Sequence, residues 1–199
     1  MLTTSFPRFQ GDSAGIFVYH LARAMNGAGH RVNVVAPWDD RAAGFEEMQG
    51  ILIHRVKYSP WKRLNMAYGA GGIPEKIRTE PAALSTLPLF TVSFMTRAAE
   101  IAADCHIIHA HWLYSGLVAG MLRKILGVPV VLTLRGSDMK FMHSHRILWP
   151  AAMLSFALVD RVTSVSSSLE GLARGMGLRE DKIETIPNGV DFSLFSPAP

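Results

Sequence analysis

The chain has 199 residues, of which 49% are hydrophobic and 18% are charged, with a formal net charge of +4. This composition is typical of a globular protein with one sizeable core and excludes a disordered one. The mild positive charge suits a phosphorylated ligand or an anionic membrane surface. It does not indicate nucleic acid as a partner, because no Lys/Arg stripe and no interleaving of aromatic with basic residues occurs.

The compartment is predicted from three observations. The single cysteine, Cys105, excludes an internal disulfide framework and fits a reducing cytoplasm. Arg8 comes early and no apolar segment of the needed length follows, so no signal peptide is expected. The longest apolar stretch, residues 151–159, is too short to span a bilayer. We therefore expect a cytoplasmic protein, with peripheral contact at the inner face of the membrane left open.

The first part of the chain predicts a βαβ unit. Residues 1–6 form a strand that Pro7 ends, a turn-rich loop runs to Gly15, and a helix follows from Ile16. Residues 31–36 form the second strand. Residues 39–49 are polar and are predicted to be loose, whereas residues 50–56 are predicted to be a strand. Residues 59–88, with several prolines and a glycine cluster, are predicted to be the least regular part, and long loops of this kind are usually functional or mobile.

Strands and helices alternate through the rest of the chain. A helix over residues 142–159 is expected to break at Pro150, and Ser167 with Glu170 matches a capping box at the start of another helix. Strands are predicted over residues 106–111, 128–134, 161–165 and 183–186, and helices over residues 89–103, 115–126 and 167–176. This alternation predicts an α/β fold with a doubly wound, mainly parallel sheet in one domain over residues 1–187.

The strand over residues 128–134 ends in Arg135-Gly136-Ser137-Asp138. Ligands of parallel sheets bind beyond the carboxyl ends of the strands, so this loop is a candidate site. Arg135 is a fixed cation suited to a phosphate or a carboxylate. Asp138 would either bind a hydroxyl group or cap the next helix.

Two more strand ends carry candidate residues. The loop from Gly11 through Asp12 to Gly15 precedes a helix and would let an anion approach the backbone, or it is an ordinary turn. Its spacing is not the G-x-G-x-x-G of dinucleotide-binding proteins. Asp39 or Asp40 falls near the place of a ribose-binding acid. His109 and His111 share one face of a strand; no third ligand joins them, so we expect no metal, with His111 contacting ligand and His109 structural.

Taken in order, several motifs carry a resemblance to a known family. They are Thr3-Thr4-Ser5-Phe6-Pro7, Gly29-His30-Arg31-Val32, His109-Ala110-His111, Gly127-Val128-Pro129, Arg135-Gly136-Ser137-Asp138 and Pro187-Asn188-Gly189-Val190-Asp191 with Phe195 and Pro197. The sequence resembles the N-terminal half of a family 4 glycosyltransferase with the GT-B architecture. The resemblance covers essentially the whole chain, and the Pro-Asn-Gly-Val-Asp signature is its strongest part.

The resemblance implies an enzyme that transfers a sugar from a nucleotide-sugar donor to a glycan, lipid or other acceptor, with retention at the anomeric carbon. No metal and no cofactor are implied, because the nucleotide sugar is a substrate. Residues 1–187 would form the Rossmann-like, acceptor-side domain. Residues 188–199 would begin the linker, with Asn188 and Gly189 as the hinge, to a C-terminal donor-binding domain that is absent here. This part alone is therefore expected to be inactive.

The resemblance also suggests roles for particular residues. Arg135 and His111 would be catalytic, whereas the donor and acceptor would contact Gly11, Asp12, Gly15, Gly136, Ser137 and Asp138. Many relatives place a His at the position of Arg135, and an arginine there would neutralise the charge that develops on pyrophosphate rather than transfer a proton. Residues 59–88 would shape the acceptor side with Lys62, Arg63, Lys76 and Arg78.

Three alternatives remain open from the sequence. The first is a nicotinamide-binding oxidoreductase domain, which the missing G-x-G-x-x-G pattern disfavours. The second is a non-catalytic module of similar fold that binds a sugar or a membrane surface. The third is another enzyme of the GT-B architecture, such as a nucleotide-sugar epimerase.

Overall fold

The computed structural model describes residues 1–59, 61, 64–68 and 72–190. The predicted site residues Lys62 and Arg63, and the linker from Asp191 onward with Phe195 and Pro197, lie outside the described residues. The strands are β1 (Leu2–Thr3), β2 (Asn33–Pro37), β3 (Phe45–Met48), β4 (Ile51–Val56), β5 (Ile108–His111), β6 (Val130–Leu134), β7 (Arg161–Ser164) and β8 (Ile183–Thr185). The helices are α1 (Ile16–Gly27), α2 (Gly72–Thr79), α3 (Leu87–Ala102), α4 (Leu113–Leu126), α5 (Ser137–Ser144), α6 (Trp149–Leu158) and α7 (Ser167–Gly175), with 3-10 turns η2 (Pro81–Thr86), η3 (Arg146–Leu148) and η4 (Glu180–Lys182).

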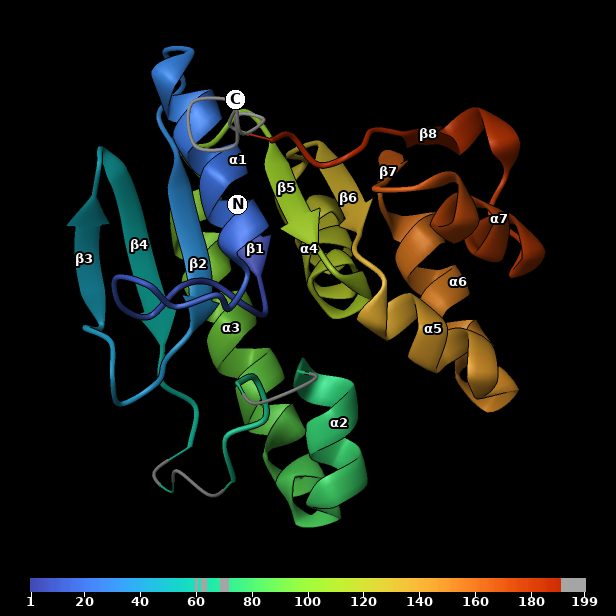
Figure 1. The fold of residues 1–199 in the computed structure, drawn as a ribbon, viewed down its shortest axis with the longest axis horizontal. Helices are drawn as coiled ribbons and strands as arrows, with labels where there is room; N and C mark the ends of the chain where they lie inside the picture. Colours follow the sequence, from blue (N-terminus) through green and yellow to red (C-terminus); the bar gives the residue numbers. More distant parts are fainter. Residues whose placement is uncertain (60, 62–63, 69–71, 191–199) are drawn as a thin grey trace, which may run out of the picture.

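These strands form one sheet in the order β3-β4-β2-β1-β5-β6-β7-β8, which Figure 1 shows from left to right. Every described pair is parallel except β3 with β4. The chain moves outward from β1 in one direction and then returns to build β5 to β8 in the other. The predicted doubly wound, mainly parallel sheet is confirmed, and its switch point lies between β1 and β5, where such sheets bind ligands.

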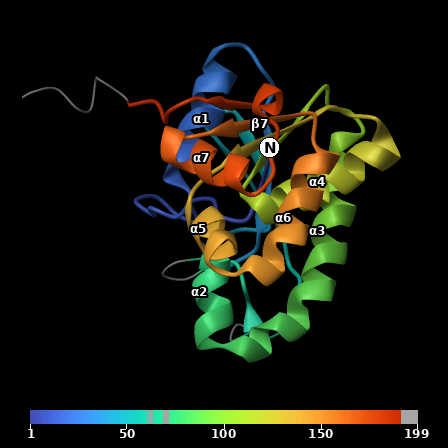
Figure 2. The same ribbon diagram turned by 90° about the vertical axis from the view of Figure 1, so that its right-hand side faces the viewer.

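Helices cover the two faces of the sheet unequally. Helices α3, α4 and α6 lie together on one face (Figure 2), where Phe90 and Phe94 of α3 join the main core. Leu169 of α7 belongs to the same core. Helix α1 buries Val18 and Ala22 in a second, smaller core. None of the helices in the described part of the chain is both long and apolar enough to cross a membrane.

Two segments are more regular than predicted. Residues 39–49 include β3, which pairs antiparallel with β4 at the edge of the sheet. An edge strand faces water on one side, so it tolerates the glutamates that make this segment look loose. Residues 59–88 include α2 and η2. Pro81 begins η2, and Pro88 lies in the first turn of α3, because the first turn of a helix requires no N–H donor from proline.

Three local predictions are also corrected. The helix predicted over residues 142–159 is interrupted at His145 to Leu148, whereas Pro150 lies in the first turn of α6. The N-cap of α7 is Ser166, whose side chain accepts from the N–H of Leu169, and not Ser167. Strand β1 is limited to Leu2–Thr3, because the chain leaves the sheet at Thr4 to form the loop before α1.

Candidate active site at the strand ends

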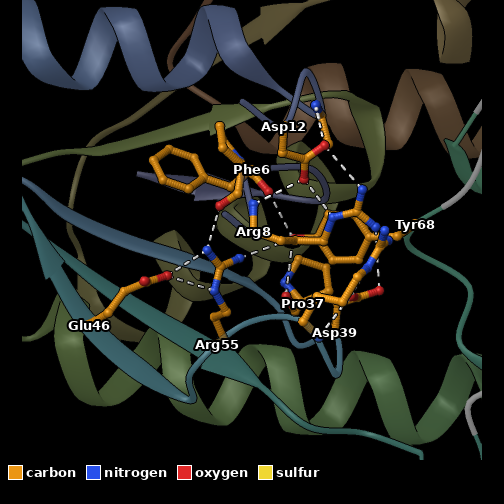
Figure 3. Close-up of polar contacts among 11 residues, drawn as sticks. Phe6, Arg8, Asp12, Pro37, Asp39, Glu46, Arg55 and Tyr68 are labelled. Atoms are coloured by element: carbon orange, nitrogen blue, oxygen red, sulfur yellow. Dashed lines mark hydrogen bonds and ion pairs between the residues drawn. The ribbon is translucent and has the colours of Figure 1, made fainter. Parts of the chain in front are cut away.

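A buried arginine holds the loop between β1 and α1 in place. The Arg55 side chain, on β4, is completely buried and pairs with Glu46 of β3 at 2.7 Å (Figure 3). Its guanidinium also donates to the carbonyl of Pro7 at 2.5 Å and to the hydroxyl of Tyr68 at 3.3 Å. A buried charge is tolerated only when it is paired and hydrogen-bonded. Strand β4 is therefore locked to the start of the loop.

The loop itself is organised by Asp12. Its carboxylate accepts from the Arg8 backbone N–H at 3.0 Å, from Arg8 Nε at 2.6 Å and from the N–H of Ala14 at 3.2 Å. The hydrogen bonds from Arg8 hold the pKa of Asp12 well below its usual range. Arg8 also stacks over the ring of Tyr68 and reaches Asp39 at 3.4 Å. The loop thus presents a paired set of charges rather than a free carboxylate.

These residues line a cavity of about 850 Å³ at the carboxyl ends of the strands. Asp12 and Ser13 form one wall, and Ser137 and Asp138 at the start of α5 form another. Asp39, one of the two candidates for a ribose-binding acid, also lines this cavity, where Arg41 pairs with it at 3.0 Å. The structure therefore places the loop after β1 and the start of α5 after β6 at one cavity.

Asp138 contacts the first turns of two helices, α4 and its own helix α5. One oxygen of its carboxylate accepts from the backbone N–H of Leu113 at 2.5 Å, so it caps the start of α4, a contact that the sequence did not indicate. Its other oxygen accepts from the N–H of Met139 at 2.9 Å. Burial raises the pKa of Asp138. This residue fixes the start of α5 against the start of α4 on the wall of the cavity.

Replacing Asp138 with alanine is expected to lower the free energy of unfolding by about 2 kcal/mol, because the buried N–H of Leu113 would lose its acceptor. Asp138→Asn keeps an acceptor and should cost about half as much.

The raised pKa of Asp138 means that the folded state holds the carboxyl proton more tightly than the unfolded state does. The contribution of Asp138 to stability therefore falls as pH rises from about 4 through the raised pKa. Urea unfolding of the wild type and both variants at several pH values measures this, and an Ala variant as stable as the wild type contradicts the capping role.

A second cavity, of about 810 Å³, lies on the α1 side of the sheet. Arg135, Asn188 and Gly189 line it, together with Phe17 of α1. The guanidinium of Arg135 lies over the Phe17 ring at 4.6 Å and donates to Asn188 Oδ1. Burial lowers the pKa of Arg135 to about 10, so the group stays charged at neutral pH. Three of the predicted site residues thus line the second cavity, and Asp12, Ser137 and Asp138 line the first. The others line neither cavity, namely Gly11, Gly15, Gly136 and His111.

The two strand histidines lie side by side beneath this second cavity, with ring centroids 4.3 Å apart. His109 contacts Thr133 Oγ1 at 2.7 Å, and Thr133 in turn contacts Thr163 across the sheet. Burial lowers the pKa of His109 to about 3. His111 accepts from Arg135 at 3.2 Å through Nδ1, and burial, with the nearby His109 and Arg135, lowers its pKa well below the usual value. Both rings are therefore neutral, and the catalytic role of His111 stays a prediction.

Trp112 lies beside the first cavity and was not singled out from the sequence. Its φ of 68° and ψ of 152° are rare for a residue with a side chain. Its ring contacts Phe17 and also lines the first cavity. Arg55 and Tyr68 were missed as well. An arginine inside the apolar strand Ile51–Val56 was the signal that could have identified Arg55, because a charge there must find partners.

Lys76 and Arg78 were expected to shape the acceptor side, but neither lines the cavity. They pair with Glu80 and Glu75 on α2 and its C-terminal end, and the apolar residues of α2 face the cavity instead. Within the described residues no group of three or more His, Cys, Asp or Glu side chains gathers as a metal site would require.

The fold belongs to the doubly wound α/β class, and the first cavity lies beside the switch point of its sheet. Residues 14–194 match the model of Glycosyltransferase Family 4, and the chain belongs to this family. It is 30% identical over 200 residues to a phosphatidylinositol N-acetylglucosaminyltransferase polypeptide of Arabidopsis thaliana, and the match covers 97% of this chain and 39% of that protein.

Two solved structures share the fold. Sucrose-phosphate synthase from Thermosynechococcus elongatus matches 99% of this chain with 22% identity and a TM-score of 0.69, over 49% of its own length. HepE from Anabaena, in complex with UDP-glucose, matches 100% of this chain with 16% identity and a TM-score of 0.66, over 46% of its own length. The chain therefore spans about half or less of each of these proteins.

Proposed function

We propose that this chain is the acceptor-side half of a glycosyltransferase that moves a sugar from a nucleotide-sugar donor to an acceptor. The observation that supports this most directly is the match to Glycosyltransferase Family 4 over residues 14–194. The first cavity supports it independently, because it lies at the switch point of the sheet and combines polar loop residues with apolar walls, as small-molecule sites do.

The donor would enter from a second domain that follows residue 190. The relatives are about twice as long as this chain, and one of them was solved with UDP-glucose. Arg135 hydrogen-bonds to Asn188, which lies in the segment after β8, and the proposed second domain would follow that segment. We propose that Arg135 faces the donor phosphates from this side when the two domains meet, without a metal ion or another cofactor.

The acceptor side would be formed by the loop before α1, the start of α5 and α2. The name of the Arabidopsis relative includes phosphatidylinositol, a lipid, so a lipid acceptor is one of the classes to test. A nicotinamide-binding domain is less favoured. The first loop has no G-x-G-x-x-G pattern, and Asp39, the candidate ribose ligand, is engaged by Arg8 and Arg41.

The test uses the complete protein that contains this chain, incubated with a panel of UDP- and GDP-linked sugars. Release of nucleoside diphosphate identifies the donor, and NMR of the early product gives the anomeric configuration. We expect retention of the donor's configuration and unchanged turnover in the presence of a chelator. Inversion would contradict the retaining mechanism, loss of turnover with the chelator would contradict metal independence, and no turnover with any sugar nucleotide would contradict the proposed function.

A further inference from the structure

The lining of the first cavity is divided by polarity. Its charged lining residues, among those described, are Arg8, Asp12, Asp39, Arg41 and Asp138. They come from the loops that follow β1 and β2 and from the start of α5. Another wall of the cavity is apolar and comes from α2, η2, the later part of α5 and the end of η3. Its side chains are Ile73, Ile77, Leu84, Phe141, Met142 and Leu148.

The apolar wall is a consequence of how α2 is patterned. Ile73 and Ile77 are four residues apart, so they lie on one face of the helix. The charged residues of this segment form pairs away from the cavity, with Lys76 Nζ 2.7 Å from Glu80 and Arg78 2.5 Å from Glu75. Helix α2 therefore turns its apolar face toward α5, and the two helices are neighbours (Figure 2).

This apolar wall reaches the surface. Leu84 is 41% exposed, and Ile147, next to the lining residue Leu148, is 88% exposed. Apolar surface that forms one side of an open cavity and continues to the outside usually contacts an apolar partner. A water-soluble sugar chain has no hydrocarbon to fill such a wall, whereas a lipid has both a polar head and an apolar chain.

We propose that the acceptor is a lipid-linked molecule. Its polar head binds beside Arg8, Asp12 and Asp39, and its hydrocarbon chain lies between Ile77 of α2 and Met142 of α5. This inference rests on the proposed function and specifies the acceptor class for the same cavity. The charged residues at the polar end of the cavity already pair with one another, so they form a rigid frame. Hydroxyl or phosphate groups of the lipid head would be positioned by contacts to this frame. The apolar wall would supply much of the binding free energy, because the hydrophobic effect is non-directional and grows with the apolar area that is buried.

The probes are methyl, hexyl and octyl β-glucoside, which share one head group and differ only in chain length. Their binding to the complete protein is measured by calorimetry below the concentration at which micelles form. Each methylene that enters the cavity should tighten binding by about two- to fourfold, so octyl glucoside should bind at least about a hundredfold more tightly than methyl glucoside.

Ile77→Asn and Met142→Gln, on opposite walls, should each remove most of this dependence on chain length. Val92→Asn is the matched control, because Val92 is exposed on α3 and does not line the cavity.

Equal binding of methyl and octyl glucoside would overturn the proposal, and so would a chain-length dependence that both wall variants retain. Transfer assays separate this inference from the proposed function. Efficient transfer to a polysaccharide, without preference for alkyl acceptors, would support the proposed glycosyltransferase function with a soluble acceptor. It would reject the proposal that the acceptor is a lipid. No donor turnover with any acceptor would reject the proposed function itself, whatever the alkyl glucosides do.

Discussion

Replacing Gly15 with alanine should lower the free energy of unfolding by about 3 kcal/mol or more, which corresponds to a fall in Tm of roughly 6–12 °C. Gly15 precedes α1 with a φ of 61°, in the left-handed region. A Cβ there would lie 2.2 Å from the carbonyl oxygen of Ser5 and 2.6 Å from its carbon. Both atoms belong to the backbone that leaves β1, so neither can move without displacing the loop. Thermal and urea unfolding of the variant measure the loss.

Gly11 provides the matched control in the same loop. Its φ is 89°, but a Cβ there would meet no atom within 4 Å. Gly11→Ala therefore carries only the conformational cost of the left-handed region, about 1–2 kcal/mol. If the two variants lost the same stability, the close approach of Gly15 to Ser5 would not matter. The comparison also assigns Gly15 a role in packing the loop, whereas its contact with a ligand stays a prediction.

Replacing Arg135 with alanine in the complete enzyme should lower kcat/KM by about 10²- to 10³-fold. The reason is that a fixed cation stabilises charge far better in a partly buried site than in water. Arg135 is held by Phe17, His111 and Asn188, and its pKa of about 10 keeps it charged at neutral pH. Arg135→Lys keeps the charge but not the planar geometry, so it should recover part of the activity. Initial rates over a range of donor concentrations measure these effects.

Asn188→Ala separates the two tasks of Arg135. It removes the contact to the segment after β8 and leaves the guanidinium, with its stacking on Phe17, in place. We expect less than about a tenfold loss of kcat/KM, the cost of one polar contact. If Asn188→Ala were as damaging as Arg135→Ala, Arg135 would act only by holding the linker, and its role toward the donor would be rejected.

The order of strands and helices was predictable because it depends on local patterns. The apolar run that becomes β6 is bounded by Pro129 and Gly136, and its end lies at the cavity edge as expected for a parallel sheet. The two errors have different causes. Strand β3 depends on pairing with β4, a contact that composition does not show. Pro81 and Pro88 lie in the first turns of η2 and α3, so they mark helix starts and not a loop.

The strand ends that border the cavities were predictable from the sequence, but which residue lines which cavity was not. Gly11 to Gly15 and Arg135 to Asp138 all follow strands, which the sequence shows. Which of them meet depends on side-chain direction at the end of β6, where Asp138 turns to one cavity and Arg135 to the other. No local pattern encodes that choice, because it is made by residues far along the chain, including Phe17 and Leu113.

The α/β class, the strand ends beside the cavities and the resemblance to family 4 glycosyltransferases could all be derived from the sequence. They follow from periodicity and from motifs that are contiguous in the chain. The fold was needed to show that Arg55 locks the first loop, that Asp138 caps α4, and that α2 turns an apolar face into the first cavity. Each of these joins residues distant in sequence, and their meeting depends on strand order and helix packing rather than on any local preference.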